Sequence, residues 1–202
     1  MRYSHLTPHQ FRAISKYVDT VYVTTYSTHA LDAAIPQACA QWIAEDITEQ
    51  VEQRFSGRIA TIEAGAILEA SEFSPTLLAR FEDRFDFPVH CGVLLSDRMF
   101  RSERLEIVSD FNTPWVILDW WQWLQKRVDE TRLTDAWMFL AHAHQTYPGS
   151  REHRSLGLEQ RVATEMTRQG QTLLQRLVDW NDNEIHTLWG RLTHDFSPNS
   201  VG

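Results

Sequence analysis

The chain changes character at residues Thr113–Trp123, which read TPWVILDWWQW. A proline opens the continuous apolar run Trp115–Leu118, a pattern typical of a strand that is covered on both faces. Asp119 then predicts a helix cap, with Gln122 three residues later as its reciprocal partner in a capping box. Four of the eight tryptophans lie in this stretch, so we expect it to hold the two halves of the chain together.

Before this stretch, short apolar runs alternate with amphipathic helices. We expect three more strands, at Val18–Thr24, Arg58–Ile62 and Val89–Leu95. The strongest helical pattern covers residues 36–55, and Gly57 ends it. Its apolar residues recur every four positions, at Cys39, Ile43, Ile47, Val51 and Phe55.

Other local signals mark where helices begin and where elements pack closely. Thr7, Pro8 and Gln10 predict a capped helix with a proline in its first turn, and Ser74-Pro75 predicts another such start. Gly92 lies inside a predicted strand, where the lack of a side chain indicates the close approach of another group.

Residues 97–110 admit two interpretations. Ser96 and Asp97 resemble a helix start, whereas Leu105–Val108 could form a short strand paired with the next one through a hairpin. We favour the helix, which gives the order β-α-β-α-β-α-β. That order predicts an α/β domain at residues 1–119, a three-layer sandwich with about four mainly parallel strands.

The chain beyond Asp119 is predicted to be helical only. One helix is expected from Asp119 to about Tyr147 and a longer one from Leu158 to Leu192, with a break at Pro148-Gly149-Ser150. Together they predict a helical hairpin, residues 120–202, that packs on the α/β domain. We expect the tail, residues 195–202, to be disordered.

Composition excludes several classes of function. The 202 residues carry a formal net charge of −8, and the basic residues are scattered, which argues against a nucleic-acid partner. No apolar run is long enough for membrane insertion, and the N-terminus lacks the apolar centre of a signal peptide. The two cysteines, Cys39 and Cys91, are interpreted as buried thiols of a cytoplasmic protein.

The sequence contains no recognisable metal or cofactor motif. His142 and His144 point to nearly opposite sides of a helix, and the glycines are too widely spaced for a phosphate-binding loop. One group of polar residues remains, at the carboxyl ends of the predicted strands, where open parallel sheets bind ligands. It comprises Thr24, Glu63, Ser96, Asp97 and Asp119. These could form a ligand site, or they could be helix caps and solvated side chains.

Three segments carry a resemblance to a known family. Lys16–Val21 (KYVDTV), Arg54–Arg58 (RFSGR) and Leu94–Asp97 (LLSD) resemble the YpiF-like family of small bacterial proteins of unknown function. The resemblance covers about residues 11–119 and implies a bacterial, cytoplasmic α/β protein. It implies no activity and no functional residue.

The long C-terminal helix gives the preferred function. Its apolar residues form two adjacent strips, wider than one docking stripe. The strips include Leu173, Leu177, Trp180, Leu188 and Trp189. We therefore predict a non-catalytic binding or assembly module, with these residues contacting a second copy or another protein. Two alternatives remain: both strips are covered within one chain, or the protein is a small-molecule or metal-dependent enzyme that uses the strand ends.

Overall fold

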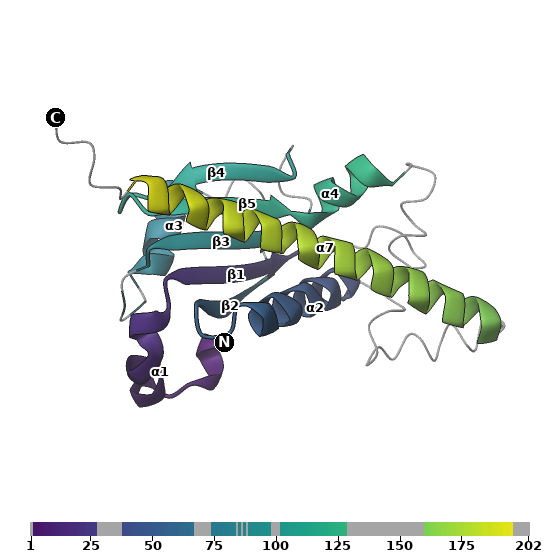
Figure 1. Ribbon diagram of the computed structural model, residues 1–202, viewed down its shortest axis with the longest axis horizontal. Coiled ribbons are helices and arrows are strands. Elements are labelled where there is room, and N and C mark those ends of the chain that lie inside the picture. Colours follow the sequence, from purple (N-terminus) through teal and green to yellow (C-terminus); the bar gives the residue numbers. More distant parts are fainter. Residues whose placement is uncertain are drawn as a thin grey trace.

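The computed structural model describes residues 2–27, 38–66, 74–83, 85, 87, 89–97, 102–128 and 160–195. These residues form one five-stranded sheet with helices on both faces (Figure 1). The strands are β1 Thr20–Tyr26, β2 Ile59–Ala66, β3 Cys91–Ser96, β4 Arg104–Val108 and β5 Pro114–Asp119. The helices are α1 Pro8–Ile14, α2 Cys39–Arg54, α3 Pro75–Glu82, α4 Trp120–Arg127 and α7 Gln160–Asp195, with short 3-10 turns at Tyr3–His5 and Ser15–Tyr17.

The sheet is mostly parallel, as predicted. Its strand order is β2-β1-β3-β5-β4, with β2, β1, β3 and β5 parallel and β4 antiparallel to β5. The described sheet therefore has five strands rather than about four. The extra strand lies at an edge, where an antiparallel strand is common on an otherwise parallel sheet.

The helix favoured for residues 97–110 is wrong, and the alternative strand is confirmed. Residues 104–108 pair with β5 in register, Leu105 opposite Ile117 and Ile107 opposite Trp115. A tight turn makes this return possible, because Asn112 adopts a left-handed conformation (φ 62°) that asparagine tolerates better than most residues. The open edge of β5 thus outweighs the weak helix propensity of this segment.

Two apolar cores lie on the two faces of the sheet. On one face, which we call the α7 face, alternate strand residues such as Tyr22, Val93 and Leu118 pack against α2, α4 and α7. On the other, Val21, Val23, Leu94, Trp115 and Ile117 pack with Phe11 of α1, Leu78 of α3, and Phe87. This alternation is the period of two that a strand imposes. It confirms the predicted three layers.

The capped helix starts are confirmed where the sequence placed them. Thr7 and Gln10 form a complete capping box with Pro8 in the first turn, and the Ser74 hydroxyl accepts the Leu77 N–H. Gly92 is packed as predicted, since a Cβ there would lie 2.3 Å from the Trp115 ring. β3 and β5 can therefore lie side by side with an indole between the sheet and α3.

The C-terminal half differs from the predicted hairpin. The helix expected from Asp119 to Tyr147 ends at Arg127, because Val128 is extended (φ −121°, ψ 133°). Residues 129–159 and 196–202 lie outside the described residues, so the hairpin is not confirmed and the predicted disordered tail is described only at Asp195. The described part contains one long helix, α7, which lies across the sheet on the face that carries Tyr22, Val93 and Leu118 (Figure 1). No helix in the described ranges is long and apolar enough to span a bilayer.

Candidate functional site

Two of the residues predicted at the carboxyl ends of the strands face different surroundings. The Thr24 hydroxyl is buried and lies 2.7 Å from the Thr48 hydroxyl of α2, so it joins strand to helix. Glu63 is on the edge strand β2, half exposed, and lies 3.7 Å from the Arg2 guanidinium. Neither contributes to a common pocket with the other predicted residues in the contacts that the structure describes.

The remaining three predicted residues do come together. Ser96 pairs with Asp119 in the ladder between β3 and β5, and Asp97 follows directly. All three are buried. The Asp97 carboxylate accepts hydrogen bonds of 2.6 Å from both the N–H and the hydroxyl of Ser27, which fasten the end of β1 to β3.

Asp119 is the helix cap that the sequence predicted. Its carboxylate accepts the Gln122 N–H at 3.0 Å, while its own N–H donates to the Glu103 carbonyl at 2.8 Å. The backbone of the β4 segment thus takes the place predicted for the Gln122 side chain. Ser96 differs from its neighbours, since its buried hydroxyl has no hydrogen-bond partner among the described residues. No metal-binding group of three acidic, histidine or cysteine residues exists among the described residues.

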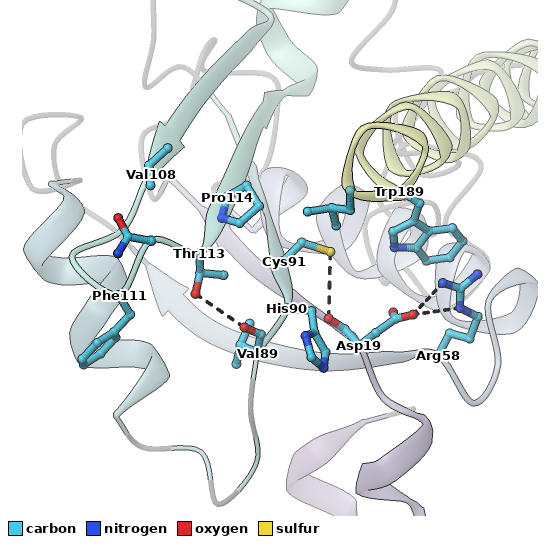
Figure 2. Close-up of a pocket in the computed structure, with 12 residues that line it drawn as sticks. Asp19, Arg58, Val89, His90, Cys91, Val108, Phe111, Thr113, Pro114 and Trp189 are labelled. Atoms are coloured by element: carbon cyan, nitrogen blue, oxygen red, sulfur yellow. Dashed lines mark hydrogen bonds and ion pairs between the residues drawn. The ribbon is translucent and has the colours of Figure 1, made fainter. Parts of the chain in front are cut away.

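An open cleft lies at the opposite end of the parallel strands, where these strands begin (Figure 2). Its volume is about 730 Å³. One wall comes from the loop that joins β4 to β5, the other from the end of α7 and the residues that precede β1 and β2. The lining residues are Asp19, Arg58, Val89, His90, Cys91, Val108, Phe111, Asn112, Thr113, Pro114, Trp189 and Leu192.

The polar wall is built around Arg58. Its Nη2 and Nε lie 2.5 and 3.1 Å from Asp19 Oδ2, and its guanidinium lies 3.7 Å from the centre of the Trp189 ring. The Arg58 carbonyl also accepts the N–H groups of Asp19 and Thr20. Gly57, with φ 90°, makes the turn from α2 that brings Arg58 to this position. The Trp189 indole N–H donates to the Thr20 hydroxyl at 2.8 Å, which fixes the ring.

The cleft holds a thiol that is not reactive. Burial raises the pKa of Cys91 to about 11, so the thiol stays protonated at neutral pH. Its Sγ lies 3.2 Å from the Thr20 hydroxyl. Burial likewise raises the pKa of Cys39, away from the cleft, to about 12. The prediction of two buried, free thiols is confirmed.

The apolar wall is exposed and firmly positioned. Val108 and Phe111 are 56% and 54% exposed, and Leu105 on the same hairpin is 39% exposed. The base of the hairpin is tied to α3 by Glu82, a buried carboxylate. Its oxygens accept the Trp115 indole N–H at 2.7 Å and the hydroxyls of Ser109 and Thr113 at 3.2 Å each. The exposed side chains therefore stand on a rigid base.

The residues predicted as an interface on the C-terminal helix pack inside the chain. Leu177, Trp180, Leu188 and Trp189 are buried in the core of the α7 face, and Leu173 packs against it. Polar contacts reinforce this packing: the Tyr22 hydroxyl donates to Asn181 Oδ1 at 2.8 Å. Of the five, Trp189 also lines the cleft.

The cleft lies where the parallel strands begin, whereas the predicted ligand residues lie at the carboxyl ends of the strands. Asp19 and Arg58 stand just before β1 and β2, but nothing local to either residue indicates their pairing. The segment Phe111–Pro114, which joins β4 to β5, gives a local turn signal but no sign that it lines a cleft. In the cleft, Cys91 is protonated and Asp19 is paired with Arg58. This arrangement is suited to binding rather than to nucleophilic chemistry.

Comparison with protein-family models, with curated proteins and with solved structures finds no match to this chain, so the resemblance to the YpiF-like family stays a prediction.

Proposed function

We propose that this protein is a non-catalytic binding and assembly module, and that its C-terminal helix serves as one wall of the contact surface. The surface consists of the cleft and the β4–β5 hairpin beside it. One wall carries Val108 and Phe111, and the other carries Trp189 and Leu192 of α7. The compartment that we propose is the bacterial cytoplasm, because two free thiols suit a reducing environment.

The observation that carries this proposal is where the exposed apolar side chains lie. Among the described residues, four large hydrophobic side chains are exposed: Tyr17, Leu105, Val108 and Phe111. Three of them belong to one hairpin beside an open cleft. Single exposed apolar residues are ordinary, but a group of them on one rigid element is typical of a protein contact surface. The aromatic ring of Phe111 is suited to anchor such a contact.

The chemistry of the cleft supports binding over catalysis. The carboxylate of Asp19 is engaged by Arg58, and Glu82 accepts three hydrogen bonds that hold the hairpin. Cys91 lacks the low pKa that a nucleophilic thiol needs. The groups that could react are thus engaged in stabilising the cleft.

Site-specific photocrosslinking tests the proposal. A benzophenone amino acid is placed at Phe111 in the full chain in living cells, and at Tyr17 as the matched control, since Tyr17 is an aromatic residue that is 62% exposed outside the cleft. We expect protein adducts from position 111 and none of comparable yield from position 17. Equal labelling at both positions, or none at position 111, would overturn the proposal.

A small-molecule enzyme with its site at the carboxyl ends of the strands is the second candidate. The observation that favours it is the buried Ser96 hydroxyl, which has no partner in the part of the chain that the structure describes and lies beside Asp97 and Asp119. A thermal-shift screen with small polar molecules tests this. A ligand that raises the melting temperature of the native chain, but not of Asp97→Asn, would support a site. If Asp97→Asn melts at a lower temperature than the native chain and no ligand is found, these residues have a structural role only.

A further inference from the structure

Among the described strands, β4 is the outer edge of the sheet, and one of its sides pairs with none of them. The hydrogen bonds at the two ends of its ladder join Glu103 with Asp119 (2.8 Å) and Ser109 with Thr113 (3.0 Å). In an antiparallel ladder the bonded residues alternate, so Leu105 and Ile107 also bond toward β5. The N–H and C=O groups of Arg104, Glu106 and Val108 therefore point outward, away from the sheet.

Part of this edge is already closed by a side chain. The Ser102 hydroxyl donates to the Arg104 carbonyl at 2.8 Å and accepts the Arg104 N–H at 3.4 Å. Within the described part of the chain, nothing bonds the outward backbone groups of Glu106 and Val108. Four groups remain, two donors and two acceptors, on two residues that are two positions apart. Such an edge is a template for one more strand.

We propose that a second copy of this chain pairs with this edge, β4 against β4, with Ile107 on the twofold axis. This inference rests on the proposed assembly function and names its partner. In this register Glu106 of each copy lies opposite Val108 of the other, and the two residues exchange both backbone hydrogen bonds. All four free groups of each strand are then paired, and the two Ile107 side chains meet across the axis.

Neighbouring registers fit less well. An axis at Glu106 sets two carboxylates opposite each other and requires the Arg104 groups that Ser102 has bonded. An axis at Val108 sets Glu106 opposite Asp110 of the second copy, again a pair of like charges. An axis at Leu105 leaves the outward groups of Val108 unpaired. On its own chain the Glu106 carboxylate is paired with Arg104 and Arg191, which reduces the repulsion in these registers. The register centred on Ile107 is the one of the four that pairs all the free groups without using the Arg104 groups and without setting a carboxylate opposite another.

Charge substitutions at Val108 test both the partner and the register. In Val108→Glu, the new carboxylate of each copy lies opposite Glu106 of the other copy. In Val108→Lys, an ammonium group takes this place. Because like charges directly opposite destabilise strand pairs, we expect sedimentation velocity on the full chain to show a dimer whose Kd rises roughly tenfold in Val108→Glu. Val108→Lys is expected to keep or lower the Kd. Circular dichroism melting serves as the folding control, since the side chain is 56% exposed.

The outcomes separate this inference from the proposed function. A wild-type chain that stays monomeric at all concentrations overturns strand pairing. Equal weakening by Val108→Glu and Val108→Lys overturns the register, because loss of the valine alone would then explain the effect. If crosslinks from Phe111 identify a different protein while the chain is monomeric, the assembly function stands and pairing with a second copy fails.

Discussion

Replacing Gly92 with alanine should destabilise the fold, and the size of the effect follows from one contact. A Cβ at this position would lie 2.3 to 2.5 Å from three atoms of the Trp115 ring. The ring cannot move away freely, because its indole N–H donates to the buried Glu82 carboxylate at 2.7 Å. Overpacking of this kind costs about 1–3 kcal/mol, and the rigid neighbour puts it at the upper end. Because alanine loses less backbone entropy than glycine on folding, the substitution also stabilises the folded chain by about 0.5–1 kcal/mol. The expected net loss is about 2 kcal/mol.

The same substitution at Gly190 is the matched control. This glycine lies inside α7, and a Cβ there would have no atom within 4 Å. Alanine should therefore stabilise the chain by up to about 1 kcal/mol through helix propensity. Urea unfolding followed by tryptophan fluorescence measures both. With an m-value of about 2 kcal/mol/M, the midpoint of Gly92→Ala should fall by about 1 M. A Gly92→Ala midpoint equal to that of the wild type would refute the packing argument, as would a loss in both variants.

Three further perturbations have defined outcomes. Asp119→Ala should lower the free energy of unfolding by about 1 kcal/mol in thermal melting, whereas Asp119→Asn can still cap α4 and should stay close to the wild type. Equal losses in the two variants would exclude the capping role. The pKa values of Cys91 and Cys39 are raised to about 11 and about 12 by burial, so both thiols bind protons in the folded chain after the unfolded chain has released them. Stability should then fall above about pH 9, by about 1.4 kcal/mol per pH unit for each thiol, and Cys39→Ala should reduce that slope in urea titrations across this range. Asn181→Leu should cost about 1–3 kcal/mol by leaving the buried Tyr22 hydroxyl without its acceptor, and adding Tyr22→Phe should recover part of the loss; a fully additive double variant would refute the coupling.

The features that depend on residues close together in the chain could be predicted from the sequence. The Thr7 and Asp119 caps depend on atoms three residues apart, and the parallel core follows from apolar runs that alternate with amphipathic helices. The strand β4 was the alternative and not the favoured prediction, because its conformation depends on pairing with β5, which helix propensity does not include. Ser96 pairs with Asp119, and Asp97 follows it, because adjacent parallel strands end at the same side of the sheet.

The cleft could not be predicted for a similar reason. Asp19, Arg58 and Trp189 meet only after β1 and β2 have paired and α7 has crossed the sheet. Their sequence separations carry no periodic signal. The apolar strips of α7 were recognised correctly, but the sequence did not reveal that the chain's own sheet covers them.

The position of α7 after all of the described strands has a consequence for synthesis. Tyr22 meets Asn181 and Thr20 meets Trp189, at separations of 159 and 169 residues. A ribosome therefore releases β1 long before the helix that covers it exists. Until then, α2 and α4 can cover only part of this face, and the part that α7 covers, with Tyr22, is exposed to solvent or to a chaperone. Nascent chains stalled before residue 160 should bind chaperones persistently, and emergence of residues 160–195 from the ribosome should be the event that ends this exposure.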